Sequence, residues 1–167
     1  MRTSTAFIIP IRDDYESLKN LLKEFSRILK SNFKINAKFI IVDDGSNSID
    51  YTVTKINDLD IEIFETNYKI GHQKAIHFAL NVVCSKFKSF NVVILDGDGE
   101  DKPQDAVNIA ELLLENSQTQ VILARRLGRN TSVSFKINYS IFRFLFKKLI
   151  GLELRSGNFM GIKSNYL

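Results

Sequence analysis

Short apolar runs alternate with amphipathic stretches along most of this 167-residue chain, and this alternation limits the folds open to it. Runs typical of buried strands cover residues 5–10, 37–43, 60–66, 90–96, 119–124 and 157–163. Between them, apolar residues recur at helical spacing over residues 14–30, 72–87, from 103 onward, and 133–150. Near-continuous apolar strands that alternate with helices are typical of a parallel sheet covered on both faces. The sequence therefore predicts an α/β fold with a mostly parallel central sheet.

The chain length favours a single domain, residues 1–167, because domains commonly contain about 100–200 residues. The composition, 44% hydrophobic and 25% charged, is close to the globular average and excludes a disordered or collagen-like chain. Cys84 is the single cysteine, so no disulfide forms within the chain and a reducing compartment is expected. The sequence shows no signal peptide and no run of about 18 apolar residues, so we expect a cytoplasmic protein without a membrane-spanning helix.

Charge is distributed unevenly along the chain. Residues 1–120 contain 14 basic and 18 acidic residues, a net charge of −4, whereas residues 121–167 contain nine basic residues and one acidic residue, a net charge of +8. Such asymmetry is typical of a chain that meets an anionic partner at one end. We expect that partner near the C-terminal end, and we do not expect it to be a nucleic acid.

Polar side chains gather where the predicted strands end. In open α/β sheets, ligands bind outside the carboxyl ends of the strands, so these side chains are expected to converge on one site. The residues that follow the first, second, fourth and fifth strands are, in order, Asp13 and Asp14; Asp43 and Asp44; Asp96, Asp98, Glu100 and Asp101; and Arg125, Arg126 and Arg129.

The acidic loop at residues 96–101 is typical of a site for a divalent cation. Carboxylates packed this closely repel one another, and a cation such as Mg²⁺ or Mn²⁺ removes that cost. Both ions prefer oxygen ligands and are usually held by one or two carboxylates together with substrate phosphates. The alternative interpretation is a solvated acidic loop that caps the helix beginning near Pro103.

Two further motifs suit a nucleotide. Asp43 or Asp44 can accept hydrogen bonds from a nucleobase or a ribose, although Asp44-Gly45 is also an ordinary turn sequence. Gly71 opens a helix whose N-terminus, with Lys74, favours phosphate. His72 could be a ligand, but a lone histidine is more often a capping or surface residue, which is the interpretation we favour. Its five-residue spacing from His77 excludes a histidine metal site.

The C-terminal basic residues suit a diphosphate, because guanidinium groups bind phosphate in a bidentate manner. The relevant side chains are Arg125, Arg126, Arg129 and Lys136, and the alternative is a solvated basic loop. The predicted helix at residues 133–150 is both basic and aromatic. It fits either a membrane interface, with its cations toward anionic headgroups, or an ordinary core helix with a basic outer face.

The order and spacing of these motifs resemble glycosyltransferase family 2 of the GT-A fold. The matching segments are Pro-x-x-Asp-Asp at residues 10–14, Val-Asp-Asp-Gly-Ser at 42–46, Gly-His-x-Lys-Ala at 71–75 and Leu-Asp-x-Asp-x-Glu-Asp-x-Pro at 95–103, followed by a basic segment. Within the family, the sequence is most similar to the branch of dolichyl-phosphate mannose synthase and undecaprenyl-phosphate sugar transferases. The resemblance implies a Rossmann-like three-layer sandwich and covers essentially the whole chain.

The resemblance also implies roles for individual residues. Those expected at the donor nucleotide are Pro10, Asp13, Asp14, Asp43, Asp44, Gly71, Lys74 and Lys136. Asp96, Asp98 and Glu100 are expected to hold Mg²⁺ or Mn²⁺. Asp96, Asp98 and Arg126 are the expected catalytic residues, with Arg126 and Lys136 facing phosphates.

The implied reaction moves a sugar, with inversion, from a UDP- or GDP-linked donor to a polyprenyl phosphate or a glycan hydroxyl. A polyprenyl phosphate is already anionic and needs no strong general base, whereas a hydroxyl acceptor needs a carboxylate base. Peripheral contact with the cytoplasmic face of a membrane is expected through residues 133–150. Because family catalytic domains usually continue further, Leu167 is expected to be a truncation point.

Two other classes share part of this pattern. A receiver-type signalling domain would use Asp43 and Asp44 as its acidic pair and Asp96 as phosphoacceptor, but a small hydroxyl residue is missing after the fifth strand. A sugar-nucleotide pyrophosphorylase would need a glycine-rich loop after the first strand, and residues 11–16 contain no glycine.

Overall fold

The computed structural model describes residues 3–32, 34–56, 58–87, 89–115, 118–124 and 158–167. The chain divides into two units, residues 1–122 with 158–167 and residues 123–157, and the central strands and the α-helices named below belong to the first. The helix predicted at residues 133–150 lies outside the described residues, as do Arg125, Arg126, Arg129 and Lys136.

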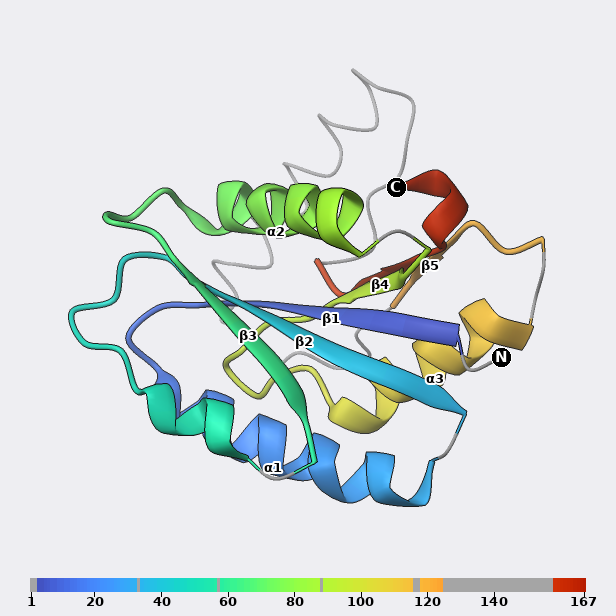
Figure 1. The fold of residues 1–167 in the computed structure, drawn as a ribbon, viewed down its shortest axis with the longest axis horizontal. Coiled ribbons are helices and arrows are strands. Elements are labelled where there is room, and N and C mark those ends of the chain that lie inside the picture. Colours follow the sequence, from blue (N-terminus) through green and yellow to red (C-terminus); the bar gives the residue numbers. More distant parts are fainter. Residues whose placement is uncertain (1–2, 33, 57, 88, 116–117, 125–157) are drawn as a thin grey trace, which may run out of the picture. The chain divides into compact units, whose positions relative to one another are not determined.

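Within the described residues, six strands form one sheet in the order β3-β2-β1-β4-β6-β5 (Figure 1). The strands are β1 (Thr3–Ile11), β2 (Ile35–Asp43), β3 (Asp60–Glu65), β4 (Asn91–Ile94), β5 (Val121–Leu123) and β6 (Met160–Ile162). The first four run parallel, whereas β6 runs antiparallel to β4. The predicted mostly parallel α/β sheet is therefore confirmed.

Three α-helices flank this sheet in the described part of the chain: α1 (Tyr15–Ser31), α2 (His72–Lys86) and α3 (Pro103–Glu115). Short 3₁₀ helices, η1 (Tyr51–Lys55) and η2 (Ser164–Tyr166), complete the described elements. Figure 1 shows α2 over one face of the sheet and α1 and α3 over the other. Among these helices, none is long and apolar enough to cross a bilayer.

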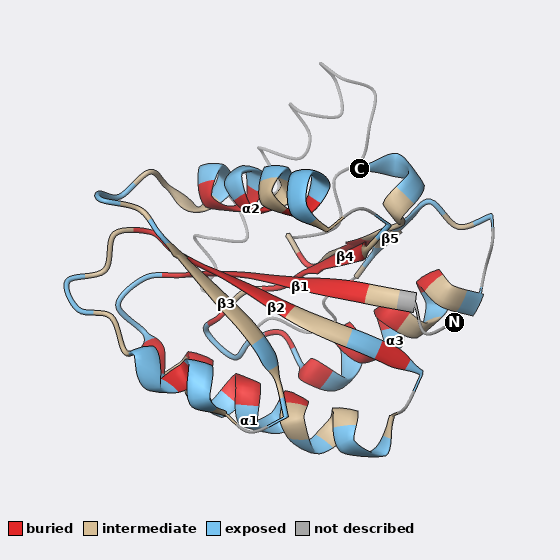
Figure 2. Ribbon diagram, viewed as in Figure 1, coloured by how far each residue is buried: buried red, intermediate tan, exposed pale blue. Residues whose placement is uncertain are grey.

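Most residues of the central strands β1, β2 and β4 are buried (Figure 2). On the α2 side, Ile8 and Ile40 belong to one buried cluster with Ala79. On the α1 side, the rings of Phe7, Phe25 and Phe39 pack together with centroids 5.0 to 5.2 Å apart. Burial on both faces explains why the strands are near-continuous apolar runs rather than alternating ones.

The helix boundaries follow from local chemistry. Asp14 precedes α1, and its Oδ1 accepts a hydrogen bond of 3.2 Å from the backbone nitrogen of Ser17, which is a typical N-cap. Strand β4 ends at Ile94, two residues earlier than the predicted strand at 90–96. Asp96 therefore lies in the loop between β4 and α3, at the edge of the sheet where ligands bind.

Candidate functional site

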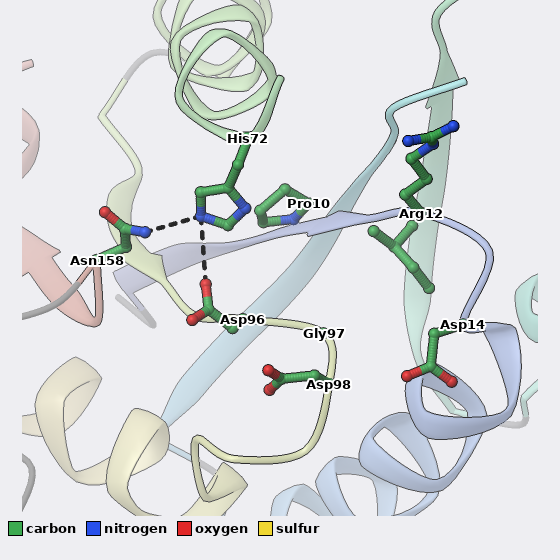
Figure 3. A pocket seen from close by; sticks show the side chains of 9 residues that line it. Pro10, Arg12, Asp14, His72, Asp96, Gly97, Asp98 and Asn158 are labelled. Carbon is green, nitrogen blue, oxygen red and sulfur yellow. Dashed lines mark hydrogen bonds and ion pairs between the residues drawn. The ribbon is translucent and has the colours of Figure 1, made fainter. Parts of the chain in front are cut away.

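A pocket of about 420 Å³ lies at the carboxyl ends of the neighbouring strands β1 and β4 (Figure 3). Because these strands are parallel, the loops that follow them emerge at the same edge of the sheet. The structure thus brings together four of the predicted site residues, Pro10, Asp14, Asp96 and Asp98. The full lining is Pro10, Ile11, Arg12, Asp14, His72, Asp96, Gly97, Asp98 and Asn158.

Backbone hydrogen bonds shape the acidic loop after β4. Asp101 is buried, and its Oδ2 accepts a hydrogen bond of 3.0 Å from the backbone nitrogen of Asp96. Oδ1 of Asp98 accepts one of 2.9 Å from the backbone nitrogen of Glu100. Asp101 therefore holds the loop, while Asp96 and Asp98 line the pocket. Glu100 does not line it, so its part in metal binding stays a prediction.

The donor set of the pocket fits Mg²⁺ or Mn²⁺ bound jointly with a phosphorylated ligand. Among the described residues, no group of three histidine, cysteine or acidic side chains forms a complete metal cage. Two carboxylates from one loop, Asp96 and Asp98, still match the usual site for these ions, in which substrate phosphates and waters supply the remaining oxygens.

His72 lies in the pocket, which differs from its interpretation as a capping or surface residue. Its Nε2 is 3.3 Å from Oδ1 of Asp96 and 2.8 Å from Nδ2 of Asn158 (Figure 3). The hydrogen bond to Asp96 raises the pKa of His72, partial burial opposes this change, and the charges of Asp96, Asp44 and Asp98 add to it. Sequence reasoning missed His72 and Asn158 as pocket residues because 86 positions separate them.

Asp13 joins the loops that follow β1 and β2 instead of lining the pocket. Its Oδ1 accepts hydrogen bonds from the backbone nitrogen and Nδ2 of Asn47, at 2.7 and 3.2 Å. Its own backbone nitrogen donates to Oγ of Ser46 at 2.8 Å. These contacts fix the loop that carries Arg12 and Asp14 into the pocket.

Asp43 is fully buried and also lies outside the pocket lining. Its Oδ2 accepts a hydrogen bond of 2.6 Å from the Tyr15 hydroxyl, and its Oδ1 accepts one of 2.7 Å from the backbone nitrogen of Ser46. Burial and the contact with Asp43 raise the pKa of Tyr15. In this structure Asp43 shapes the edge of the sheet, and its contact with a nucleoside stays a prediction.

Asp44 accepts hydrogen bonds at the start of α2. Its Oδ1 lies 2.6 Å from the backbone nitrogen of Ile70, and its two carboxylate oxygens lie 3.1 and 3.0 Å from that of Gly71. A carboxylate is well placed there, because helix N-termini favour negative charge. The Gly71 amide that was expected to meet phosphate thus donates to Asp44. Lys74 is exposed on α2 and does not line the pocket.

The family model described as glycosyl transferase family 2 matches residues 6–165. The chain belongs to glycosyltransferase family 2. This assignment does not favour the receiver domain or the pyrophosphorylase. No curated protein sequence matches the chain.

Solved structures of glycosyltransferases share the fold of this family 2 chain. Mannosyl-3-phosphoglycerate synthase from Rubrobacter xylanophilus matches 97% of the chain and 53% of its own length, with a TM-score of 0.70 and 16% identity. Glucosyl-3-phosphoglycerate synthase from Mycobacterium tuberculosis, in complex with UDP, matches 98% of the chain and 57% of its own length, with a TM-score of 0.67 and 14% identity. TarS from S. aureus, residues 1–349, matches 77% of the chain and 37% of its own length, with a TM-score of 0.56 and 18% identity.

These structures establish the GT-A fold for the chain, with its mostly parallel sheet between helices. The chain spans about half the length of the two synthases that it matches.

Proposed function

We propose that this family 2 glycosyltransferase binds a nucleotide diphospho-sugar in the pocket between β1 and β4 and transfers the sugar, with inversion, to an acceptor. The observation that carries the proposal is the convergence of Asp14, Asp96 and Asp98 on one pocket at the carboxyl ends of parallel strands. In such sheets this edge is where nucleotides bind. Pro10 and Asp14, from the loop after β1, bind the nucleoside of a UDP- or GDP-linked donor.

Asp96 and Asp98 hold Mg²⁺ or Mn²⁺, with Glu100 as a further ligand. When bound, the ion supplies Lewis-acid stabilisation of the negative charge that builds on the departing diphosphate. The protein contributes two fixed carboxylates on a loop that Asp101 braces from within. In support, glucosyl-3-phosphoglycerate synthase, which shares the fold, has been solved with Mn²⁺ and UDP.

The basic residues Arg126 and Lys136 neutralise the diphosphate of the donor. This role is supported by the net charge of +8 on residues 121–167, which complements an anionic ligand. The acceptor is a polyprenyl phosphate or a glycan hydroxyl. With a polyprenyl phosphate, residues 133–150 contact the membrane surface from the cytoplasmic side.

Calorimetry with UDP-glucose and GDP-mannose in the presence of Mn²⁺ tests donor binding. We expect Asp98→Asn to weaken the binding of the preferred donor at least 10-fold, because a metal ligand is lost. Glu24→Gln, an exposed carboxylate on α1, is the matched control and should bind like the wild type. Donor binding by Asp98→Asn as tight as that of the wild type would overturn the assignment of Asp98 as a metal ligand. Donor binding that does not depend on Mn²⁺ would overturn the proposed role of the metal.

Liposome flotation tests membrane contact. A variant with Lys136, Arg143, Lys147 and Lys148 all changed to Glu should lose flotation with vesicles that contain anionic lipid, because the attraction to the headgroups is reversed. Equal flotation of both proteins would contradict an electrostatic membrane contact.

A further inference from the structure

A short chain of polar side chains connects α2, the β4–α3 loop and the start of β6. Nε2 of Gln73 donates a hydrogen bond of 2.9 Å to Oδ1 of Asn158. Nδ2 of Asn158 lies 2.8 Å from Nε2 of His72, and the same nitrogen lies 3.3 Å from Oδ1 of Asp96. Figure 3 shows the imidazole between Asn158 and Asp96.

The topology of the sheet brings these groups together. Strands β4 and β6 are antiparallel, with Ile94 opposite Met160. Asp96 follows Ile94 by two residues and Asn158 precedes Met160 by two, so both leave the sheet at the same place. His72, the first residue of α2, reaches this place from the face of the sheet that α2 covers. Asp44 fixes that helix end through the Ile70 and Gly71 amides.

The hydrogen bonds of this chain can run in either direction. Nε2 of a neutral imidazole accepts when the proton is on Nδ1 and donates when the proton is on Nε2, but it cannot do both at once. In the first arrangement Asn158 donates to His72. In the second, the amides of Asn158 and Gln73 are turned, and Oδ1 of Asp96 and Oδ1 of Asn158 share the single Nε2 proton of His72. Only the second arrangement places a proton between His72 and Asp96, so it is the one in which the imidazole holds the carboxylate.

We propose that His72 is the positioning residue of Asp96: held by Asn158 and Gln73, it fixes the carboxylate in the orientation that binds a divalent cation. This inference rests on the proposed function, because it assigns Asp96 to the metal. Carboxylates that ligate metals are themselves hydrogen-bonded by neighbouring groups, and loss of such a neighbour typically lowers metal affinity about 10–100-fold.

The contacts of Nε2 favour positioning over direct ligation. A zinc-type imidazole ligand approaches its metal to about 2.0–2.1 Å. Nε2 of His72 faces the Asn158 amide at 2.8 Å, so an ion at that nitrogen would have to displace the amide. Oxygen ligands also suit Mg²⁺ and Mn²⁺ better than imidazole does.

Two variants that differ by one methylene group test the proposal. The amide nitrogen of Gln in His72→Gln reaches about as far as Nε2 of histidine, whereas that of Asn in His72→Asn reaches only as far as Nδ1. Mn²⁺ affinity is measured by calorimetry in the presence of saturating UDP or GDP. We expect His72→Asn and His72→Leu to weaken Mn²⁺ binding about 10–100-fold and His72→Gln to retain most of it.

His77→Leu is the matched control, since His77 is exposed on the same helix and should leave Mn²⁺ affinity unchanged. Thermal unfolding without metal shows whether each variant folds, and His72→Asn decides the question if His72→Leu does not. Wild-type affinity in His72→Asn would overturn the role of His72 while the proposed function stands. Absence of Mn²⁺ and nucleotide binding by the wild type would overturn the proposed function, and this inference with it.

Discussion

The Tyr15 hydroxyl donates a hydrogen bond of 2.6 Å to Oδ2 of Asp43, which joins the first residue of α1 to the last residue of β2. The carboxylate is fully buried, and its other oxygen accepts from the Ser46 amide at 2.7 Å. A buried charge is tolerated only when hydrogen bonds or opposite charges replace the lost water. Asp43 therefore depends on Tyr15 and on the turn that follows β2.

Tyr15→Phe removes one of these hydrogen bonds and leaves the ring in place. We expect the free energy of unfolding to fall by about 1–3 kcal/mol, because one oxygen of a buried carboxylate loses its donor. Urea unfolding measures the change. Tyr51→Phe is the control, because Tyr51 is exposed and its hydroxyl bonds to Glu65 at the surface. This variant should lose less unfolding free energy than Tyr15→Phe. Equal losses in the two variants would contradict the role of Tyr15.

The same contact predicts a dependence on alkaline pH. Burial, the hydrogen bond to Asp43 and the charges of Asp43 and Glu65 raise the pKa of Tyr15 above its ordinary value. The folded protein thus keeps the phenolic proton more tightly than the unfolded chain does. This contribution to stability is complete below pH about 10 and is lost above it, by at most about 1.4 kcal/mol per pH unit.

The difference in unfolding free energy between wild type and Tyr15→Phe should therefore shrink as pH rises from about 9 to about 11. Urea unfolding at several pH values measures both proteins, and the comparison cancels the titration of lysines and of Tyr51, whose pKa is also raised. A difference that stays constant over this range would contradict the prediction.

Most of the fold could be predicted from the sequence, because hydrophobic periodicity indicates where the strands and helices lie. The run at 37–43 appears as β2 (Ile35–Asp43), and the amphipathic stretch at 72–87 appears as α2 (His72–Lys86). The antiparallel direction of β6 was not predicted, since a three-residue strand has no pattern that reveals its direction. The 3₁₀ helix η1 was missed because one short turn has too few residues to show a period.

The candidate site could be predicted only in part. Asp14, Asp96 and Asp98, which were singled out because they follow predicted strands, line one pocket. The sequence could not distinguish these from Asp43, which has the same kind of position but is turned inward to Tyr15. That difference depends on side-chain partners far away in the chain, as does the place of Asn158 beside His72.

Asp44 is expected to stabilise the start of α2. Asp44→Ala leaves the Ile70 and Gly71 amides without their acceptor, and we expect a loss of about 1–3 kcal/mol in unfolding free energy. Asp44→Asn keeps one acceptor oxygen and should lose less. Hydrogen exchange of the Ile70 and Gly71 amides should become faster in Asp44→Ala. Glu24→Ala, an exposed change on α1, should stay within about 0.5 kcal/mol. Unchanged exchange rates in Asp44→Ala would contradict the assignment.

Gly45, directly after Asp44, is required both by its backbone conformation and by its surroundings. Its φ is +69°, and a Cβ atom there would lie 2.6 Å from the carbonyl carbon of Tyr68 and 2.7 Å from the nitrogen of Lys69. Gly99 has a similar φ of +81°, but a Cβ there would meet no atom within 4 Å among the described residues. The two glycines therefore separate the cost of the conformation from the cost of the clash.

Gly99→Ala should lose about 1–2 kcal/mol, the usual cost of a left-handed conformation for a residue with a Cβ. Gly45→Ala should lose clearly more, because the backbone at Tyr68 and Lys69 must also move. That movement would disturb the segment that leads to Ile70, so faster exchange of the Ile70 amide should accompany it. Urea unfolding of the two variants measures the difference. Equal losses of unfolding free energy would show that the close approach of Gly45 to Tyr68 and Lys69 contributes nothing to stability. That result would contradict the coupling of the turn after β2 to the start of α2.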